Sequence, residues 1–419
     1  MLRELQPIVE SLAEKLGRAV AVDDPRMRLL AHTAHNEPVD KHRLDSVMRL
    51  SVDDSIVAHA MRSGIASAAG PVRVPGIPEK GLLPRLCIPV RCQNLLLGYL
   101  WLIDEHGTLT DAEIDLSMHA ADEAGQRLFH DRLLEDAKRS RSRGLVRDLL
   151  SDDPVVRSHA AQDILDDDDT RIAGKCCVVV WRASTSSDDN DRNAARAAID
   201  SALHRAAQRL TTYGAMETSR AGGTGILLVS RVDTMLSRDG IFKVAQSVRE
   251  ELLRVLGDDI TVRAAVGMTV SSIESAVESS STAHDALRVS EVVPGIGSVV
   301  DWESLGIYRM LAQLPLDGLP RESIPRGLLR LIEADDSGQL VHTLEVYLDM
   351  AGSAQRAADT LHVHRGSLYY RLSRIEDVAA VNLADGGERL GIHLGIKLAR
   401  LTGMLSSPER THDTPPSRP

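Results

Sequence analysis

The amino-acid sequence predicts a multidomain α+β protein whose C-terminal part is entirely helical. The chain has 419 residues, which corresponds to roughly two to four domains. Hydrophobic residues make up 43% of it, enough to fill ordinary globular cores. Short aliphatic runs alternate with helical patterns up to about residue 300, and beyond that point almost no strand pattern remains.

Residues 1–109 have the pattern of a small antiparallel sheet with flanking helices. Apolar residues recur at helical spacing between Leu5 and Leu16, and a polar region with helical stretches spans residues 42–62. The last two strands are expected to form a hairpin around residues 91–94. The strand candidates are residues 19–22, 27–32, 86–90 and 95–103.

Residues 110–170 are predicted to be a helical linker followed by an acidic loop. Thr110 and Glu113 have the spacing of a capping box, from which one long helix, or two in sequence, would continue to residue 150. The apolar stripe Ile114–Leu134 would need a partner to cover it, which predicts a dimer interface. The alternative is a helix folded back on its own domain.

Two charged runs in this linker are predicted to lie at the surface. The basic run at residues 138–143 is expected to be a solvated face rather than a contact with nucleic acid. Residues 151–169 are acidic and contain four consecutive aspartates, Asp166–Asp169, which repel one another. We therefore expect a surface loop and a domain boundary in this stretch.

Residues 171–300 alternate strands and helices in the order β-α-β-β-α-β-α, which matches the split βαβ, ferredoxin-like pattern. The second and third strands would be joined by the glycine-rich turn Ala221–Gly225, and residues 298–302 can add a last strand. The other strand candidates are 175–182, 215–220, 226–231 and 261–266, and the helix candidates are 194–210, 242–256 and 273–292.

Charge and cysteine content bear on the class of protein. The net charge of −11 argues against unspecific coating of nucleic acid but leaves room for a local basic surface. No secretory signal pattern is visible, and the most apolar stretch, residues 95–103, is too short to span a bilayer, so a soluble cytoplasmic protein is expected. The four cysteines are expected to be small buried hydrophobic residues. They are Cys87, Cys92, Cys176 and Cys177, of which the first two could approach each other across a turn.

The strongest motif lies at residues 353–375. Gly352 ends one helical pattern and Ser353 can cap the next, in which Ala357 and Ala358 allow two helices to approach closely. A short turn leads to a second helix with a single apolar stripe, so the segment is predicted to be a helix-turn-helix. Leu361 and Val363 flank the turn, and the stripe is Leu368, Leu372 and Ile375.

The other side of the second helix is predicted to contact double-stranded DNA. Between His362 and Ile375 there are three arginines and two histidines but no acidic residue, a reversal of the chain's overall charge that favours a phosphate-facing surface. Recognition helices present their N-terminal side chains to base edges. His364, Arg365 and Ser367 therefore hold the best positions to contact bases in the major groove. The alternative is an ordinary helical hairpin with a cationic face. The predicted DNA-binding residues are His364, Arg365, Ser367, Tyr369, Tyr370, Arg371, Ser373 and Arg374, with Arg371 equally suited to a structural ion pair.

The same residues resemble the C-terminal helix-turn-helix of the PucR/CdaR family of transcriptional regulators. The resemblance covers about Gln339–Leu401 and includes the Ala357-Ala358 and His364-Arg365 pairs, the run Leu368–Ile375 and a closing helix at residues 382–398. The family commonly has Asn-Thr after the His-Arg pair, where this chain has Gly366-Ser367, so its base preference is not carried over. The resemblance also implies a degenerate GGDEF-like domain at 171–300 and a GAF-like sensor at 1–109.

We therefore expect a sequence-specific transcriptional regulator that acts as a homodimer or higher homo-oligomer. It would be controlled by a small-molecule effector or another signal that the N-terminal domains sense. The helical domain would span residues 301–405, followed by a disordered tail at 406–419. No catalytic residue, metal site or cofactor is expected, because the turn at Ala221–Gly225 has no carboxylates to hold magnesium. The alternatives are a signalling protein that binds a nucleotide in the central domain, and a dimeric scaffold whose C-terminal bundle binds protein.

Overall fold

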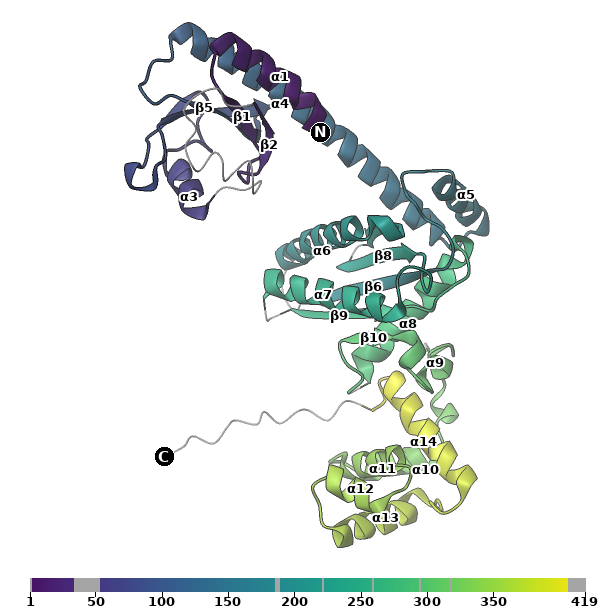
Figure 1. Cartoon of the computed structure of the whole chain (residues 1–419). Helices are drawn as coiled ribbons and strands as arrows, with labels where there is room; N and C mark the ends of the chain where they lie inside the picture. The colour runs from purple at the N-terminus through teal and green to yellow at the C-terminus, as the bar shows by residue number, and fades with distance from the viewer. Residues whose placement is uncertain are drawn as a thin grey trace, which may run out of the picture. The chain divides into compact units, whose positions relative to one another are not determined.

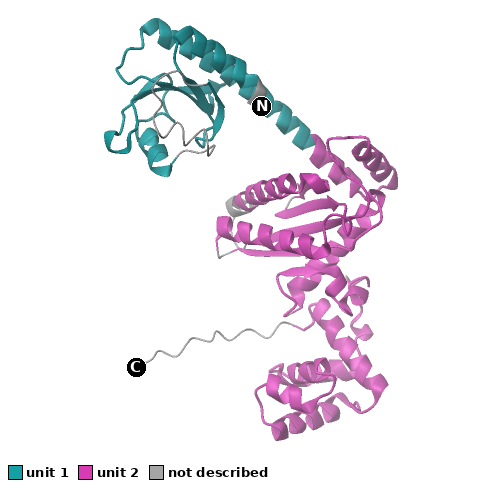
Figure 2. Cartoon of the chain, in the orientation of Figure 1, with its two compact units in different colours: residues 1–140 teal, residues 141–419 magenta. Residues whose placement is uncertain are grey.

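The computed structural model divides into two compact units, residues 1–140 and residues 141–419 (Figure 2). No helix among the described residues is both long and apolar enough to cross a bilayer. The predicted tail at 406–419, and the part of the predicted polar region before residue 53, lie outside the described residues. The described residues are 2–33, 53–184, 189–220, 222–257, 260–293, 295–316 and 319–405.

Unit 1 is built on a five-stranded antiparallel sheet, of which Figure 1 labels β1, β2 and β5. The order of its strands is β2-β1-β5-β4-β3. Four of these strands were predicted from the sequence, whereas β3 has only three residues and gives no readable period. The strands are β1 (Val20–Asp23), β2 (Leu29–His32), β3 (Val72–Val74), β4 (Arg85–Cys92) and β5 (Leu95–Ile103). The helices are α1 (Leu2–Leu16) and α3 (Asp54–Arg62), with a 3-10 turn at Pro78–Lys80.

Helices cover both faces of this sheet because side chains alternate along its strands. On β5, Leu100 and Leu102 pack in a cluster with α1 and the following helix, while Tyr99 and Trp101 pack in a second cluster with α3. The predicted hairpin is confirmed: Gln93 and Asn94 have φ angles of 49° and 64°, as a two-residue hairpin turn requires.

The cysteines are all free, and three of them are buried. Cys87 and Cys92 lie on the same strand, β4, so the expectation that they could meet across the turn is wrong. Burial raises the pKa of the Cys87 thiol, and it raises the pKa values of Cys176 and Cys177 to about 12. These three thiols are therefore unreactive core residues, as the sequence predicted, and Cys92 is half-buried.

A single helix, α4 (Asp111–Leu149), spans the predicted linker. It begins at the predicted capping box, in which the Thr110 N–H and hydroxyl each lie 2.8 Å from the Glu113 carboxylate. The backbone hydrogen bond from Thr110, aided by the hydroxyl, holds the pKa of Glu113 below its usual range. Ala124 and Leu128 are buried in the core of unit 1, so this half of the helix is folded back on its own domain.

The acidic stretch after α4 is not a loop throughout, which corrects the sequence prediction. Residues Pro154–Leu165 form helix α5. Asp153 caps it by accepting a hydrogen bond from the Val155 N–H at 2.8 Å, and Pro154 occupies the first helical position, where a missing N–H costs nothing. Ile164 is fully buried in the core of unit 2, which fixes the helix in place.

The basic run is also not fully solvated. The Arg143 guanidinium lies 3.0 Å from the Glu217 carboxylate and 3.5 Å from that of Asp200. Glu217 is only 5% exposed, and a carboxylate buried in this way is costly unless it is paired. At Arg143, therefore, the expectation of a solvated face is wrong.

Unit 2 contains a second five-stranded sheet with the order β10-β9-β6-β8-β7 (Figure 1). β6 pairs antiparallel with β9 and β8, and β10 joins β9 in parallel at the edge. The predicted succession of strands and helices is confirmed, including the last strand. The elements are β6 (Cys176–Ser184), α6 (Asp189–Arg209), β7 (Ala215–Arg220), β8 (Thr224–Ser230), α7 (Arg238–Leu256), β9 (Thr261–Val266), α8 (Ala276–Val292) and β10 (Val299–Asp301), with 3-10 turns at Thr211–Tyr213, Ile273–Ser275 and Trp302–Ser304.

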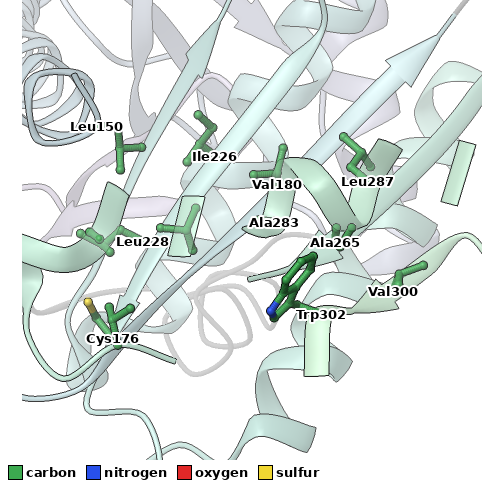
Figure 3. Close-up of a cluster of buried hydrophobic side chains, with 14 of the residues drawn as sticks. Leu150, Cys176, Val180, Ile226, Leu228, Ala265, Ala283, Leu287, Val300 and Trp302 are labelled. Atoms are coloured by element: carbon green, nitrogen blue, oxygen red, sulfur yellow. The ribbon is translucent and has the colours of Figure 1, made fainter. Parts of the chain in front are cut away.

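Both faces of this central sheet are covered by helices. Val178 and Val180 of β6 belong to a cluster with α8, whereas Val179 and Trp181 belong to a cluster with α6 and α7. This two-sided burial explains why β6 is a continuous apolar run. Figure 3 shows the first cluster, which extends to Trp302 beyond the last strand.

From Tyr308 onward, the described residues of unit 2 form helices joined by turns and loops, and they include no strand. α14 belongs to two cores: Ile392 and Ile396 pack with the other C-terminal helices, whereas Leu401 packs in the cluster of the central sheet. The helices are α9 (Tyr308–Leu311), α10 (Arg326–Ala334), α11 (Gln339–Asp349), α12 (Ala354–Thr360), α13 (Arg365–Ala379) and α14 (Gly386–Leu401), with a 3-10 turn at Arg321–Ser323.

Candidate DNA-binding site

The predicted helix-turn-helix consists of α12, the turn at residues 361–364 and α13. α11 ends before Ala351 and Gly352, which both have positive φ angles, and Ser353 then caps α12 by accepting a hydrogen bond from the Arg356 N–H. Ala357 and Ala358 are buried, and their small side chains let α12 pack closely between α11 and α13. The first helix therefore begins and packs as the sequence predicted.

The turn between the two helices is fixed by backbone hydrogen bonds. The Leu361 N–H donates to the Ala357 carbonyl at 2.9 Å, and the Val363 N–H donates to the Ala358 carbonyl at 3.0 Å. His362 has a φ of 53°, in the left-handed region that glycine usually occupies at helix ends. Leu361 and Val363 lie half-buried against the helical core, so the turn holds α13 at one angle to α12.

α13 buries one face and exposes the other. The predicted apolar stripe is confirmed, because Leu368, Leu372 and Ile375 are all buried in the core shared with α10, α11 and α14. Tyr370, on the opposite side, is 75% exposed, and Tyr369 at the edge is 54% exposed. The helix is thus anchored by its inner face while its outer side chains remain available.

Most of the predicted DNA-binding residues lie on this exposed surface of α13. Within the described residues, Arg365 and Arg374 form no ion pair, so their charges are not neutralised by a neighbouring carboxylate. The exception is Arg371, which is half-buried and donates a hydrogen bond to the Thr343 hydroxyl of α11 at 3.2 Å. The exposed residues are His364, Arg365, Ser367, Tyr369, Tyr370, Ser373 and Arg374.

His364 has a second role that the sequence did not predict. It is the N-cap of α13, and its Nδ1 atom accepts a hydrogen bond from the Gly366 N–H at 3.2 Å. This contact satisfies one of the backbone N–H groups that the first turn of any helix leaves unpaired. His364 is therefore both an exposed residue of this surface and the N-cap of α13.

A partly buried cluster of charged side chains links α11 to α14 behind this surface, and the sequence did not predict it. The Lys397 ammonium lies 2.8 Å from Asp349 and 3.4 Å from Glu345, and Arg400 lies 2.8 Å from Glu345. His393 adds a contact of 2.8 Å to Asp349. The pairs are 44 to 55 residues apart in the chain, so no local spacing reveals them.

The contacts of Asp349 with Lys397 and His393 shift the pKa values of Asp349 and Lys397. Burial alone would raise the pKa of Asp349, but hydrogen bonds from His393 and Lys397 outweigh it and hold the pKa below its usual value. Burial alone would lower the pKa of Lys397, but its hydrogen bond to Asp349 and the nearby charges raise it. Both groups are therefore charged at neutral pH, as a close ion pair requires.

Unit 2 has two other candidate sites, a hollow beside α11 and α14 and the hairpin between β7 and β8. A hollow of about 640 Å³ lies where α11 and α14 meet the segment Val293–Tyr308, and most of its walls are apolar. At the central hairpin, β8 begins at Thr224, so the predicted turn Ala221–Gly225 is shorter than expected: Gly222 and Gly223 form it with φ angles of 83° and 72°, and Ala221 lies outside the described residues. Among the described residues, no group of His, Cys, Asp and Glu side chains is arranged to hold a metal ion.

Three proteins of Bacillus subtilis (strain 168) are similar to the chain. The DNA-binding transcriptional activator AdeR is 21% identical over 408 residues, which cover 95% of this chain and 93% of AdeR. The proline-responsive transcriptional activator PutR is 18% identical over 412 residues, which cover 95% of this chain and 97% of PutR. The purine catabolism regulatory protein is 27% identical over 121 residues, covering 28% of this chain and 22% of that protein.

Two family models match parts of the chain. Residues 340–398 match the PucR C-terminal helix-turn-helix domain, and residues 169–289 match the GGDEF-like domain. The first match contains α11 to α13 and most of α14, and the second contains β6 to β9 and most of α8. The C-terminal region of the chain is therefore a PucR-type helix-turn-helix domain, and it follows a GGDEF-like domain.

Proposed function

We propose that the protein is a transcriptional regulator that binds double-stranded DNA by placing α13 in the major groove. The observation that carries this proposal is the two-sided character of α13. Its inner face is anchored by Leu368 and Leu372, and its outer face from His364 to Arg374 is exposed, with cations but no carboxylate. A helix held in this way after a tight turn can reach base edges with its first residues and phosphates with its flanks.

The relatives support the proposal. AdeR and PutR carry names of transcriptional activators, and each is similar to this chain over nearly its whole length. The name of PutR describes a response to proline, which supports control of this protein by a small-molecule effector as well. We place the effector-sensing role in the N-terminal domain, residues 1–109, as a GAF-like domain whose five-stranded sheet has helices on both faces.

We assign no catalytic role to the GGDEF-like domain, residues 171–300. The strand order β9-β6-β8-β7 supports a ferredoxin-like core, a fold on which many functions occur. The hairpin between β7 and β8 has the sequence Ala221-Gly-Gly-Thr-Gly225, without a carboxylate that could hold a magnesium ion. Phosphoryl transfer depends on such an ion to neutralise developing charge, so the domain is proposed to support or regulate the DNA-binding domain at residues 301–405.

Selection of genomic fragments with the purified full-length protein tests the proposed function. A sequence-specific regulator should enrich a small set of fragments that share a short sequence, and binding should survive an excess of competitor DNA at about 0.15 M salt. Enrichment without a shared sequence, or binding that the competitor removes, would contradict the proposal. The cytoplasmic location that we propose follows from the same function, since the operator is chromosomal DNA.

A further inference from the structure

The N-cap of α13 is an unusual choice of residue. Ser, Thr, Asp and Asn are the usual N-caps, because one short side-chain oxygen is enough to accept the free backbone N–H. Here His364 does this through Nδ1, at 3.2 Å from the Gly366 nitrogen. An imidazole ring carries a second nitrogen, Nε2, which capping does not use.

The capping contact fixes the proton on that second nitrogen. Nδ1 can accept a hydrogen bond from Gly366 only if it carries no proton, and a neutral imidazole then carries its proton on Nε2. The side chain of His364 is exposed, and Nε2 makes no hydrogen bond to any of the described residues. The recognition surface therefore holds a ring whose free nitrogen is a hydrogen-bond donor.

Gly366 leaves the space beside this ring open. A Cβ atom at residue 366 would lie 3.4 Å from Nδ1 and 4.0 Å from Cε1 of His364, in ordinary van der Waals contact with the ring. Glycine at this position thus removes a side chain that would stand beside the imidazole on the exposed side of the helix. The ring and the first residue of the helix, Arg365, then share the N-terminal end of α13 that enters the groove first in helix-turn-helix proteins.

We propose that His364 is a specificity-determining residue that donates a hydrogen bond from Nε2 to an acceptor on the DNA, most directly a purine N7 or guanine O6 in the major groove. The inference rests on the proposed DNA-binding function. A fixed donor discriminates by chemistry: it can pair with guanine N7 or O6, adenine N7 or thymine O4, but not with the amino groups of cytosine or adenine. A phosphate oxygen is an acceptor of the same chemistry, and the experiment below separates it from a base.

The central experiment compares His364→Ser with the wild-type protein on a selected operator duplex. Serine keeps the cap because its hydroxyl can accept the Gly366 N–H, but it cannot reach the DNA. We expect the melting temperature to be unchanged or slightly raised and the Kd to rise about fivefold to tenfold. If His364 were only a cap, His364→Ser would bind like the wild type, and the proposal would be overturned.

A neighbouring histidine serves as the matched control. His362 is also exposed, but it lies in the turn with a φ of 53°, a conformation that asparagine tolerates. His362→Asn therefore removes an imidazole two positions away without straining the backbone, and we expect its Kd to match that of the wild type. A loss as large as that of His364→Ser would show that the effect does not depend on the capped ring, and would overturn the proposal.

Modified duplexes identify the acceptor. Purines in the operator are replaced one at a time by 7-deaza analogues, and phosphates by uncharged methylphosphonates. At the true contact, the modification should weaken wild-type binding but should not weaken His364→Ser further, since the interaction is already lost. Such coupling at a purine supports the proposal as stated, and coupling only at a phosphate assigns the donor to the backbone and overturns base discrimination by His364.

The tautomer can be measured without DNA. Long-range proton–nitrogen correlation spectra of histidine-labelled full-length protein distinguish an Nδ1 that accepts from one that carries the proton, and His364→Ser identifies the signal. We expect an unprotonated Nδ1 and a protonated Nε2, as the capping contact requires. A proton on Nδ1 would overturn the proposal even if the operator is bound. Failure to select any operator would instead count against the proposed function, so the two failures are distinguishable.

Discussion

Two arginines of α13 show how position on a helix decides the role of a side chain. Arg365 is the first residue of the helix and is exposed, whereas Arg371 is half-buried and donates to the Thr343 hydroxyl. The sequence placed Arg371 beside the apolar stripe by helical angle and left open a structural role or a DNA contact. Its partner proves to be a hydroxyl of α11, a residue on another helix that no local pattern indicates.

Replacing Arg365 with Ala is expected to weaken specific DNA binding by about 1–3 kcal/mol, as for loss of a base contact. The melting temperature should not change, because the side chain is exposed and forms no part of the core. Arg254→Ala, which removes an exposed arginine from α7 in the central domain, is the matched control and should leave the Kd unaltered. Equal affinities of Arg365→Ala and wild type on the selected operator would refute the assignment of α13.

The Asp349 carboxylate should make the stability of the helical domain sensitive to acid. Its pKa is held below the usual value by His393 and Lys397, so its stabilising effect is present above the ordinary Asp value and is lost as the pH falls through the lowered pKa. Asp349→Asn should therefore lower the melting temperature by a few degrees at pH 7, and the difference should shrink below about pH 4. Thermal melts of both proteins across this range provide the measurement, and a difference that stays constant with pH would contradict the ion-pair account.

At the scale of elements, the sequence predicted those with a clear period and missed those without one. All strands except β3, the capping box of α4 and the stripe of α13 follow local rules, and the sequence predicted them. β3 is too short to show alternation, and α5 was hidden because its carboxylates suggested a solvated loop while Asp153-Pro154, a start signal, was overlooked. The candidate site was predicted because its residues lie on α13, a helix with a clear local pattern. The charge cluster behind it was not predicted, because it joins residues that are far apart in the sequence.

A close approach between β9 and α8 gives a sharp test at this scale. A Cβ atom at Gly267 would lie 2.0 Å from the Ser279 carbonyl oxygen, which belongs to helix backbone and cannot turn away. Gly267→Ala should therefore destabilise the protein by about 1–3 kcal/mol or more, measured by urea unfolding. The control is Gly144→Ala: this glycine lies inside α4 with nothing within 4 Å of the added atom, and alanine should stabilise the helix by up to about 1 kcal/mol. A neutral Gly267→Ala would show that β9 and α8 pack less tightly than described.

At the scale of the whole molecule, part of the apolar stripe that the sequence assigned to a dimer interface is buried within unit 1 and part of it is exposed. Leu128 is 7% exposed and belongs to the core of unit 1, so it is not free to contact another chain. The large apolar residues of α4 that are exposed are Met118, Leu133 and Leu134. These three side chains are the ones that a second copy of the chain could cover.

The protein is predicted to sediment as a dimer at micromolar concentration, and Leu133→Asp combined with Leu134→Asp should convert it to a monomer. Two carboxylates at these exposed positions would be costly to bury between chains but cheap to leave in water. Leu165→Asp, at an exposed position of α5, is the control and should remain dimeric. A monomeric wild-type protein would refute the dimer, and a dimeric double variant would move its interface away from α4.

The purified protein is also predicted to form no cyclic dinucleotide from GTP and magnesium. The reason is chemical: the turn around Gly222 and Gly223 offers backbone but no carboxylate for the ion. Product analysis by liquid chromatography after long incubation, beside a mock preparation, makes the measurement. Product formed in molar excess over the protein, and absent from the mock sample, would contradict this prediction and show catalysis.

Because α14 packs in two hydrophobic cores, it decides which boundaries a transferable fragment of this protein can have. The segment that matches the helix-turn-helix family, residues 340–398, ends before Leu401 and begins after Leu328 and Leu331 of α10, although the latter two residues fill the same core as the recognition helix. A graft limited to the matched segment would therefore leave one helix missing and another shortened. Because Leu401 is seated among the side chains of the neighbouring domain, even a longer graft gives up an anchor at its last turn. The transferable domain is larger than the motif that identifies it, and a chimera should take its donor sequence from residue 141, where unit 2 begins, through residue 405.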